Sequence, residues 1–508
     1  MGARTTRGRG TLAAVTAGAA LLSLAACSSG GQGDRGGPDT GKAGAERPQR
    51  IAWKPCPADA TEGAPKGAEC GTVRVPVDWT APGGEKLDVA VVRRKATRQD
   101  ERIGTLMFLP GGPGNSGVQN VAGTKEWGGA EHRFDIVSFD PRGTGLSSPV
   151  RCPAKPLAAM ITDKRPVTTT GDFARLKKRA TGLAAECART SGAVARHTDA
   201  GSVSRDMDVI RAALGEDQVS LYGHSYGTVY GQRYAAMYGG RVRAAVLDGV
   251  MDPAIGRRAF GVTGAKALEG AFGEFARWCG RSRDCELGER DAWRVYEDLA
   301  ARATQGTLRN GGKDVPLAEL NGTIDAMLLT PSWPAVAQYL HALDTGKPWE
   351  TDEGGVPQGE KLLPGADLSV CADLNLRVPD AAAYLADQRA ARASAPRFGY
   401  SPNTVSYANL CQGLPAPQAV PDDEKAVDTR TPLLLIGARY DNATPLDWAR
   451  SVQRRLGDRA ALVEVKGWGH AVKIFNGGAE RDTVLRYLTD LDVPKPGTVV
   501  EGGTPPGA

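Results

Sequence analysis

The stretch VSLYGHSYGTVYGQRYAAMYGG, residues 219–240, decides the fold. It begins as an apolar run typical of a buried strand and continues with the composition of a helix. Between the two lies the pentapeptide GHSYG (223–227), with a serine at its centre. A serine on a sharp strand-to-helix turn has a strained backbone, and small flanking residues allow the turn to close. The stretch therefore predicts that Ser225 is a nucleophile presented at a sheet edge, rather than part of a plain glycine-rich turn.

Further short apolar runs surround this stretch and alternate with helical segments. Two precede it, GTLMFLPGGPG and FDIVSFDPRGTGLSS, and three follow it, VRAAVLDGVMDP, TPLLLIGARYDNATP and ALVEVKGWGHAV. Continuous apolar strands alternating with helices are typical of a buried parallel sheet covered by helices on both faces. We therefore expect an α/β protein with a mostly parallel central sheet.

The chain divides into segments of different character. Residues 252–430 contain amphipathic helices and proline-rich loops without such strands, so they predict a largely helical cap insertion that interrupts the sheet. The sheet domain then comprises residues 51–251 and 431–495, and the Gly/Pro-rich residues 496–508 predict a disordered tail.

The N-terminus has the features of an export signal. Three arginines precede an uncharged apolar stretch that is short for a membrane span, which predicts a signal peptide over residues 1–26. That stretch ends in LAAC and resembles a bacterial lipobox, so we expect lipidation at Cys27 rather than ordinary cleavage after a small residue. Residues 27–50 are polar and glycine-rich and predict a flexible tether. We therefore expect an exported protein that is secreted or anchored to the membrane only through Cys27.

Eight cysteines follow Cys27. An even number in an exported chain predicts disulfides. Short loops close most readily, so the expected pairs are near neighbours: Cys56–Cys70, Cys152–Cys187, Cys279–Cys285 and Cys371–Cys411. Because the sequence lacks the C-x-x-C and H-E-x-x-H motifs and its histidines are scattered, no metal site is expected.

A serine nucleophile needs a general base, and the base needs an orienting acid. Asp441 stands where the apolar run of 431–445 ends, and His470 follows the next run and is flanked by glycine. The order Ser, Asp, His and the position of each residue at a strand end predict a catalytic triad. His224 is not expected to take part, because side chains adjacent in sequence diverge.

The oxyanion formed by acyl transfer needs two N–H donors. One is expected from Tyr226, the residue after the nucleophile. The other is expected from the loop PGGPG (110–114), where Gly112 is preferred and Gly111 is the alternative, because Pro113 has no N–H.

These motifs together resemble those of the prolyl-iminopeptidase-related α/β hydrolases, and most closely the secreted tripeptidyl aminopeptidase family of actinobacteria. The resemblance rests on GGPG, DPRGTGLSS and GHSYGT, on Trp53, Cys56 and Cys70 before VPVDW, and on the D-x-x-TP segment at Asp441. It covers residues 51–498. Pro110 stands where prolyl iminopeptidases usually have histidine, which favours the tripeptidyl branch. A cysteine pair that tripeptidyl members often carry after the catalytic histidine is absent here.

The resemblance implies an α/β-hydrolase fold and a serine peptidase that releases short peptides, tripeptides foremost, from free N-termini without a cofactor. Peptides are then the expected partners of a monomeric chain, and a carboxylate of the cap insertion would bind the substrate's ammonium group. The candidates for that role are Glu269, Glu274 and Asp373. Two alternatives stay open: a carboxylesterase or other non-peptide hydrolase with the same triad, and a non-catalytic envelope lipoprotein. The net charge of +5, with acids and bases intermixed, gives no indication of nucleic-acid binding.

Overall fold

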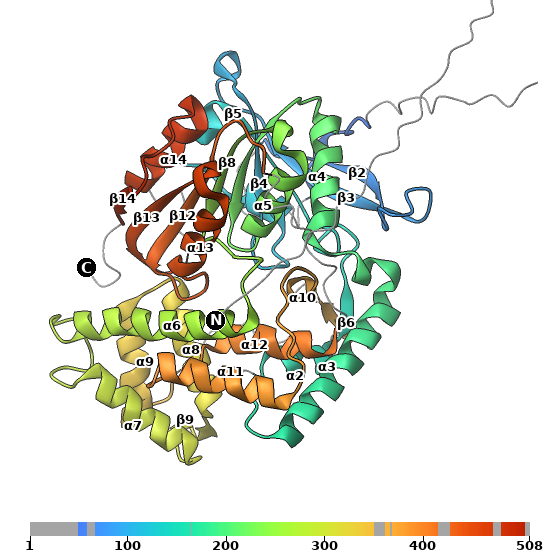
Figure 1. The fold of residues 1–508 in the computed structure, drawn as a ribbon. Coiled ribbons are helices and arrows are strands. Elements are labelled where there is room, and N and C mark those ends of the chain that lie inside the picture. Colours follow the sequence, from blue (N-terminus) through green and yellow to red (C-terminus); the bar gives the residue numbers. More distant parts are fainter. Residues whose placement is uncertain are drawn as a thin grey trace, which may run out of the picture. The chain divides into compact units, whose positions relative to one another are not determined.

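In the computed structural model, a single large sheet forms the centre of the α/β part of the chain (Figure 1). The structure describes residues 49–57, 67–163, 165–349, 361–365, 368–414, 427–470 and 479–502. Within these ranges ten strands form the sheet, in the order β1-β2-β3-β5-β4-β7-β8-β12-β13-β14. The strands β1, β2, β3 and β5 pair antiparallel, and every pair from β5 to β14 is parallel. In sheet order the bounds are Lys54–Pro55, Glu69–Pro76, Lys86–Arg94, Phe134–Phe139, Gly104–Leu109, Val219–His224, Val242–Asp248, Leu433–Tyr440, Ala460–Trp468 and Val499–Glu501.

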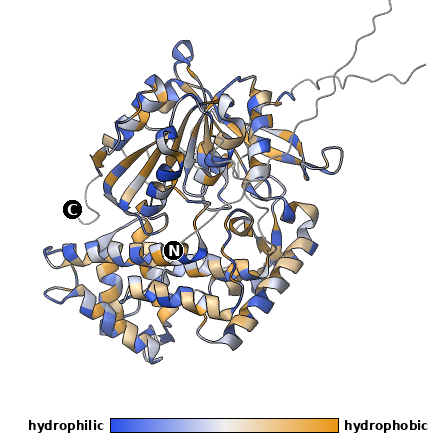
Figure 2. Cartoon of the chain, in the orientation of Figure 1, coloured by the Kyte–Doolittle hydropathy of each residue, from blue (hydrophilic) through white to orange (hydrophobic). Residues whose placement is uncertain are grey.

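The central strands are apolar on both faces because helices cover both faces. Successive residues of one strand belong to different hydrophobic clusters, as Met107 and Leu109 do on one face and Leu106 and Phe108 on the other. Figure 2 shows the hydrophobic colour of these strands. The helices α1 (Gly117–Gly123) and α14 (Ala479–Asp490) pack in one cluster, and α4 (Ala200–Leu214), α5 (Gly227–Tyr238) and α13 (Leu446–Leu456) pack in the other. The predicted α/β class with a mostly parallel sheet is confirmed.

The cap insertion is helical, and its residues 268–343 form most of an aromatic core of their own, whereas the buried residues between 368 and 410 belong mostly to the cluster of α4 and α5. Phe272, Tyr296 and Phe398 lie at the centre of this aromatic core, with ring centroids 4.3–5.4 Å apart. The helices of the insertion are α6 (Arg257–Cys279), α7 (Ala292–Thr304), α8 (Leu317–Leu329), α9 (Trp333–Thr345), α10 (Ser369–Asp373), α11 (Ala381–Ser394) and α12 (Pro402–Leu410). Only short strands occur among its described residues: β9 (Arg309–Asn310), β10 (Lys313–Asp314) and β11 (Leu362–Pro364).

Two helices from the N-terminal half extend this helical layer. The helices α2 (Ala154–Ile161) and α3 (Thr170–Ser191) pack against α12 and α11, and Figure 1 shows them beside these helices. The strand β6 (Arg151–Pro153), which precedes α2, pairs with β11 of the insertion. The predicted boundary at residue 252 therefore leaves out two helices that belong to the same layer.

The C-terminal segment ends in a strand rather than in the predicted disordered tail. β14 pairs in parallel with β13 through residues 499–501, so the prediction is wrong for the described part of 496–508. The valines Val499 and Val500 have high β propensity, but the glycines beside them have low β propensity, so the sequence pattern did not indicate a strand here. Residues 503–508 lie outside the described residues.

The structure pairs the eight cysteines in the four disulfides predicted from their spacing. Disulfides of this number are typical of exported proteins. No helix in the described part of the chain is long and apolar enough to cross a membrane. The predicted signal peptide, the site of lipidation at Cys27 and the tether up to residue 48 lie outside the described residues.

Candidate active site

Ser225 lies on the sharp turn between β7 and α5, as the opening stretch predicts. Its backbone has φ 55°, a left-handed conformation that a non-glycine residue rarely adopts, and its N–H donates to the Asp248 carbonyl at 2.8 Å. The flanking glycines are required by close packing: a Cβ at Gly227 would lie 2.1 Å from the Leu109 carbonyl oxygen. A Cβ at Gly223 would lie 2.8 Å from the carbonyl oxygen of Gly227. The close packing of these two glycines therefore holds Ser225 in its strained backbone conformation, and this conformation presents the serine hydroxyl.

His470 lies within hydrogen-bond distance of that hydroxyl. Its Nε2 is 2.8 Å from Ser225 Oγ, and its Nδ1 is 2.9 Å and 3.1 Å from the two carboxylate oxygens of Asp441. When Nδ1 carries the proton, Nε2 is free to accept the proton of the serine. The strand order explains the assembly, since β12 and β13 are neighbours and their carboxyl ends carry Asp441 and His470.

Asp441 is fully buried and held by several donors. The N–H groups of Ala443 and Thr444 donate to its Oδ1 at 2.8 Å, and the Thr444 hydroxyl donates to its Oδ2 at 2.8 Å. Burial raises the pKa of this carboxyl, but the charge of His470 and the donated hydrogen bonds outweigh it and leave the pKa below its ordinary value. The carboxylate is therefore ionised at neutral pH and can stabilise an imidazolium.

The glycine-rich loop after β4 lies directly beside the nucleophile. A Cβ built on Gly111 would lie 3.0 Å from the Ser225 Cβ, and Gly112 has φ +107°, which favours glycine. The strands β4 and β7, which precede this loop and the serine, are neighbours in the sheet. Among the described residues no acceptor takes the N–H of Gly112 or of Tyr226, so both donors are available to an oxyanion. Their role in an oxyanion hole stays a prediction.

The DPRGTG segment after β5 supports this loop. Asp140 accepts hydrogen bonds from the Ser116 hydroxyl at 2.6 Å and from the Val118 N–H at 3.0 Å, at the start of α1. Arg142, fully buried, forms a bidentate ion pair with Asp206. The segment is therefore structural, and it orders the residues that follow the glycine-rich loop.

The three carboxylates predicted to bind the substrate's ammonium group have partners within the protein. Glu269 accepts from the N–H groups of Arg397 and Phe398, at 3.0 Å and 3.2 Å. Glu274 pairs with Arg277 and accepts from Trp468 Nε1. These contacts hold both carboxylates within the folded chain, and their role as ligands of the substrate's ammonium group stays a prediction.

Asp373 lies closer to the nucleophile, although as a buried structural group. It accepts from the Tyr226 hydroxyl and, at 2.8 Å, from the Ala200 N–H at the start of α4. Burial raises its pKa to about 7, against the opposing effect of these two hydrogen bonds. Asp373 thus ties the short helix α10 to the side chain of the residue whose N–H is expected to face the oxyanion.

Two features of the site were not predicted from the sequence. The Thr444 hydroxyl lies 3.2 Å from His470 Nδ1 as well as contacting Asp441, so it borders both triad partners. The loops of the acid and the base are also attached to α8: Asn442 donates to Asp325 at 2.7 Å, and the His470 N–H donates to the Leu329 carbonyl at 2.7 Å. The D-x-x-TP segment contains this threonine but did not reveal its role, and no sequence signal indicated the contacts with α8. As expected, His224 packs beside the site, with its ring centroid 5.6 Å from that of His470.

The chain is similar in sequence to a known family and to several hydrolases. The profile of the family described as alpha/beta hydrolase fold matches residues 104–477. Serine protease Hip1 of Mycobacterium tuberculosis (strain ATCC 25618 / H37Rv) is 27% identical over 486 residues, with 88% of this chain and 90% of the relative covered. The tripeptidyl aminopeptidase of Streptomyces lividans is 28% identical over 462 residues, covering 86% and 84%. Carboxylesterase B of the same M. tuberculosis strain is 31% identical over 472 residues, covering 87% and 88%.

Proposed function

Since the chain belongs to the α/β-hydrolase family and is a serine hydrolase, we propose that it is an exported peptidase that releases tripeptides from free N-termini. The observation that carries the acyl-transfer part of this proposal is the distance of 2.8 Å between His470 Nε2 and the Ser225 hydroxyl, beside a buried and ionised Asp441. Relatives named serine protease and tripeptidyl aminopeptidase, aligned over most of the chain, support peptides as the substrate class.

The proposed reaction is acyl transfer in two steps. Ser225 Oγ bonds to the scissile carbonyl carbon while His470 accepts the hydroxyl proton, and Asp441 stabilises the imidazolium. The N–H groups of Gly112 and Tyr226 stabilise the oxyanion. His470 then donates the proton to the leaving amine as the C–N bond breaks. Water, deprotonated by the same imidazole, attacks the acyl-enzyme and releases the short peptide and the serine.

The cellular location is part of the proposal. Four disulfides support an oxidising compartment, and the LAAC sequence supports lipidation of Cys27 after export. The tether that follows would leave the enzyme attached to the membrane through the lipid alone. Mass spectrometry of the N-terminal peptide, before and after Cys27→Ser, tests this part.

A carboxylesterase is the second candidate, favoured by the relative that bears this name and is 31% identical. The triad would form an acyl-enzyme from an ester in the same way, because the alcohol rather than the amine would leave. The two candidates therefore differ in the bond cleaved and not in the catalytic residues.

One experiment distinguishes them. Full-length protein purified in detergent is given three substrates: a tripeptide anilide with a free N-terminus, the same anilide N-acetylated, and a short-chain ester. Ser225→Ala, expected to lower kcat about 10⁴- to 10⁶-fold, is the control. Strong preference for the free tripeptide, lost in the variant, is the expected result. Equal cleavage of the blocked anilide would indicate an endopeptidase, and cleavage of the ester alone would contradict the peptidase proposal.

A further inference from the structure

The Tyr226 side chain is held at its hydroxyl end by a buried carboxylate. The hydroxyl donates to Asp373 Oδ2 at 2.5 Å, and the tyrosine is 1% exposed. Burial, together with the charge of Asp373, raises the pKa of Tyr226 well above its ordinary value, so the hydroxyl keeps its proton and acts as a donor. The residue whose N–H is expected to face the oxyanion is therefore held through its side chain as well as through its backbone.

Asp373 is in turn fixed from two directions. Its other carboxylate oxygen accepts the Ala200 N–H at 2.8 Å, at the N-terminus of α4, where the helix dipole favours a negative charge. Two residues before Asp373, Cys371 forms a disulfide with Cys411, which directly follows α12. The sheet domain and the cap insertion therefore both determine where the carboxylate lies.

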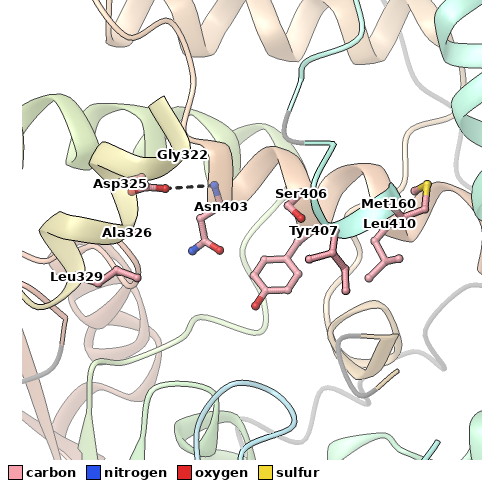
Figure 3. Close-up of a pocket in the computed structure, with 10 residues that line it drawn as sticks. Met160, Gly322, Asp325, Ala326, Leu329, Asn403, Ser406, Tyr407 and Leu410 are labelled. Atoms are coloured by element: carbon pink, nitrogen blue, oxygen red, sulfur yellow. Dashed lines mark hydrogen bonds between the residues drawn. The ribbon is translucent and has the colours of Figure 1, made fainter. Parts of the chain in front are cut away.

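Packing alone fixes the ring of Tyr226 only in part. The Tyr230 ring packs edge-on against it, with the centroids 5.4 Å apart. Tyr407 of α12 is close enough for its charge to affect the pKa of Tyr226. Tyr407 also lines a pocket of about 180 Å³ between α2, α8 and α12, which is shown in Figure 3. Since open space restrains its surroundings less than a filled core does, the hydrogen bond to Asp373 is the directional contact that fixes the ring.

The backbone of the nucleophile turn needs such a restraint. Ser225 has φ 55°, and a strained residue of this kind persists only where its surroundings hold it in place. Tyr226 follows it directly and begins α5, whose N-terminus has no side-chain cap among the described residues. A tyrosine has only two rotatable side-chain bonds, so a displacement of its hydroxyl end is passed largely to its backbone. Loss of the bond to Asp373 would therefore turn the Tyr226 N–H away from its present direction.

We propose that Asp373 is a positioning residue for catalysis: through the Tyr226 hydroxyl it holds the Tyr226 N–H in the direction of the oxyanion. The inference rests on the proposed acyl transfer and deepens it. In this role Asp373 does not touch the substrate, in contrast to the ammonium-binding role predicted from the sequence. The cap insertion then contributes to stabilisation of the transition state, through the five-residue helix α10 that a disulfide holds in place.

The test compares Tyr226→Phe with Tyr384→Phe. The first variant removes the hydroxyl that bonds Asp373 and keeps the ring, and the second removes another buried hydroxyl, which donates to Asn409 at 2.7 Å within the cap insertion. Loss of one oxyanion donor costs about 10²- to 10³-fold in kcat, so a displaced donor should cost about 10- to 100-fold. We expect this fall in kcat for the short-chain ester in Tyr226→Phe, with KM changed less than about threefold. Tyr384→Phe should stay within about threefold of wild type in both constants.

Inhibition by a trifluoromethyl ketone separates positioning from folding. Ser225 Oγ bonds to the ketone carbon while His470 accepts the hydroxyl proton, and the hemiketal oxygen then occupies the oxyanion position. Ki does not depend on the fraction of enzyme that is folded, so a merely structural role would leave Ki unchanged. In Tyr226→Phe we expect Ki to rise by the factor by which kcat/KM falls, about 10- to 100-fold. A fall in kcat with an unchanged Ki, or no change in either, would overturn the inference.

A second variant, Asp373→Asn, tests the carboxylate itself. Asparagine keeps the size of the side chain and removes the charge that attracts the hydroxyl proton. If Asp373 acts through Tyr226, the variant should raise Ki in the wild-type background and change it less than about threefold in the Tyr226→Phe background. Equal effects in both backgrounds would count against the inference. Should Tyr226→Phe fail to fold, an unchanged Ki in Asp373→Asn alone would overturn it.

The same assays distinguish failure of the inference from failure of the proposed function. Wild type that hydrolyses the ester but neither anilide would defeat the peptidase proposal alone, because acyl transfer to Ser225 and the Ki comparison would stand. Wild type that cleaves no substrate and is not inhibited by the ketone would overturn both.

Discussion

The attachment of His470 to the cap insertion makes Gly469→Ala a sharp test of the site. Gly469 has φ +81°, and a Cβ there would lie 2.4 Å from Pro331 Cδ and 2.8 Å from the Leu329 carbonyl oxygen. The left-handed backbone alone would cost about 1–2 kcal/mol for alanine. Restoring an ordinary carbon contact of about 3.5 Å also requires the loop to move by about 1 Å. The hydrogen bond of 2.7 Å from the His470 N–H to Leu329 would then be broken or displaced.

A displacement of about 1 Å in a catalytic group costs on the order of 100-fold in rate. We therefore expect kcat for the short-chain ester to fall by about 30- to 100-fold in Gly469→Ala, while the melting temperature falls by only a few degrees. Gly346→Ala is the matched control, because Gly346 has φ +73° and open space around its Cβ position. It shares the backbone strain without the collision. Activity of Gly469→Ala within threefold of wild type, or equal loss in both variants, would refute the reasoning.

The remaining predictions concern the buried groups around the triad. Thr444→Val should lower kcat about tenfold, because it removes the hydroxyl that donates to Asp441 and borders His470. Thr444→Ser, which keeps the hydroxyl, should restore the activity. An unchanged kcat in Thr444→Val would contradict this prediction. Asp373 has a folded-state pKa of about 7, above its unfolded value, so its contribution to stability is present below about pH 4 and is lost as the pH rises to about 7. Asp373→Asn should therefore gain stability relative to wild type as the pH rises from about 4 to about 7, with a constant difference above that. Denaturant unfolding across this range measures the effect, and a difference that does not vary with pH would exclude it.

The catalytic residues could be predicted from the sequence because each follows a strand that is buried on both faces. Such strands appear as continuous apolar runs, and in a parallel sheet their carboxyl ends lie at one edge. Ser225, Asp441 and His470 all stand immediately after such runs. The disulfides could be predicted from the order of the cysteines, since each joins two cysteines that are consecutive in the sequence.

The contacts of the carboxylates in the cap insertion could not be predicted in this way. Helical residues at the surface and at an interface have the same sequence pattern, so nothing local showed that Glu269, Glu274 and Asp373 are hydrogen-bonded within the protein. The contribution of α2 and α3 to the same helical layer was hidden as well. Their place depends on tertiary contacts with α11 and α12, which follow 190 or more residues later in the chain (residue 191 to residue 381), and local periodicity carries no information about such contacts.

The position of α8 suggests why the cap insertion interrupts the sheet before β12 and not elsewhere. The strands that carry Asp441 and His470 follow the insertion, and both of their loops bond to α8 through Asn442 and the His470 N–H. On this arrangement the insertion supports the two loops that carry the acid and the base of the triad, so its removal would affect catalysis without touching the triad side chains.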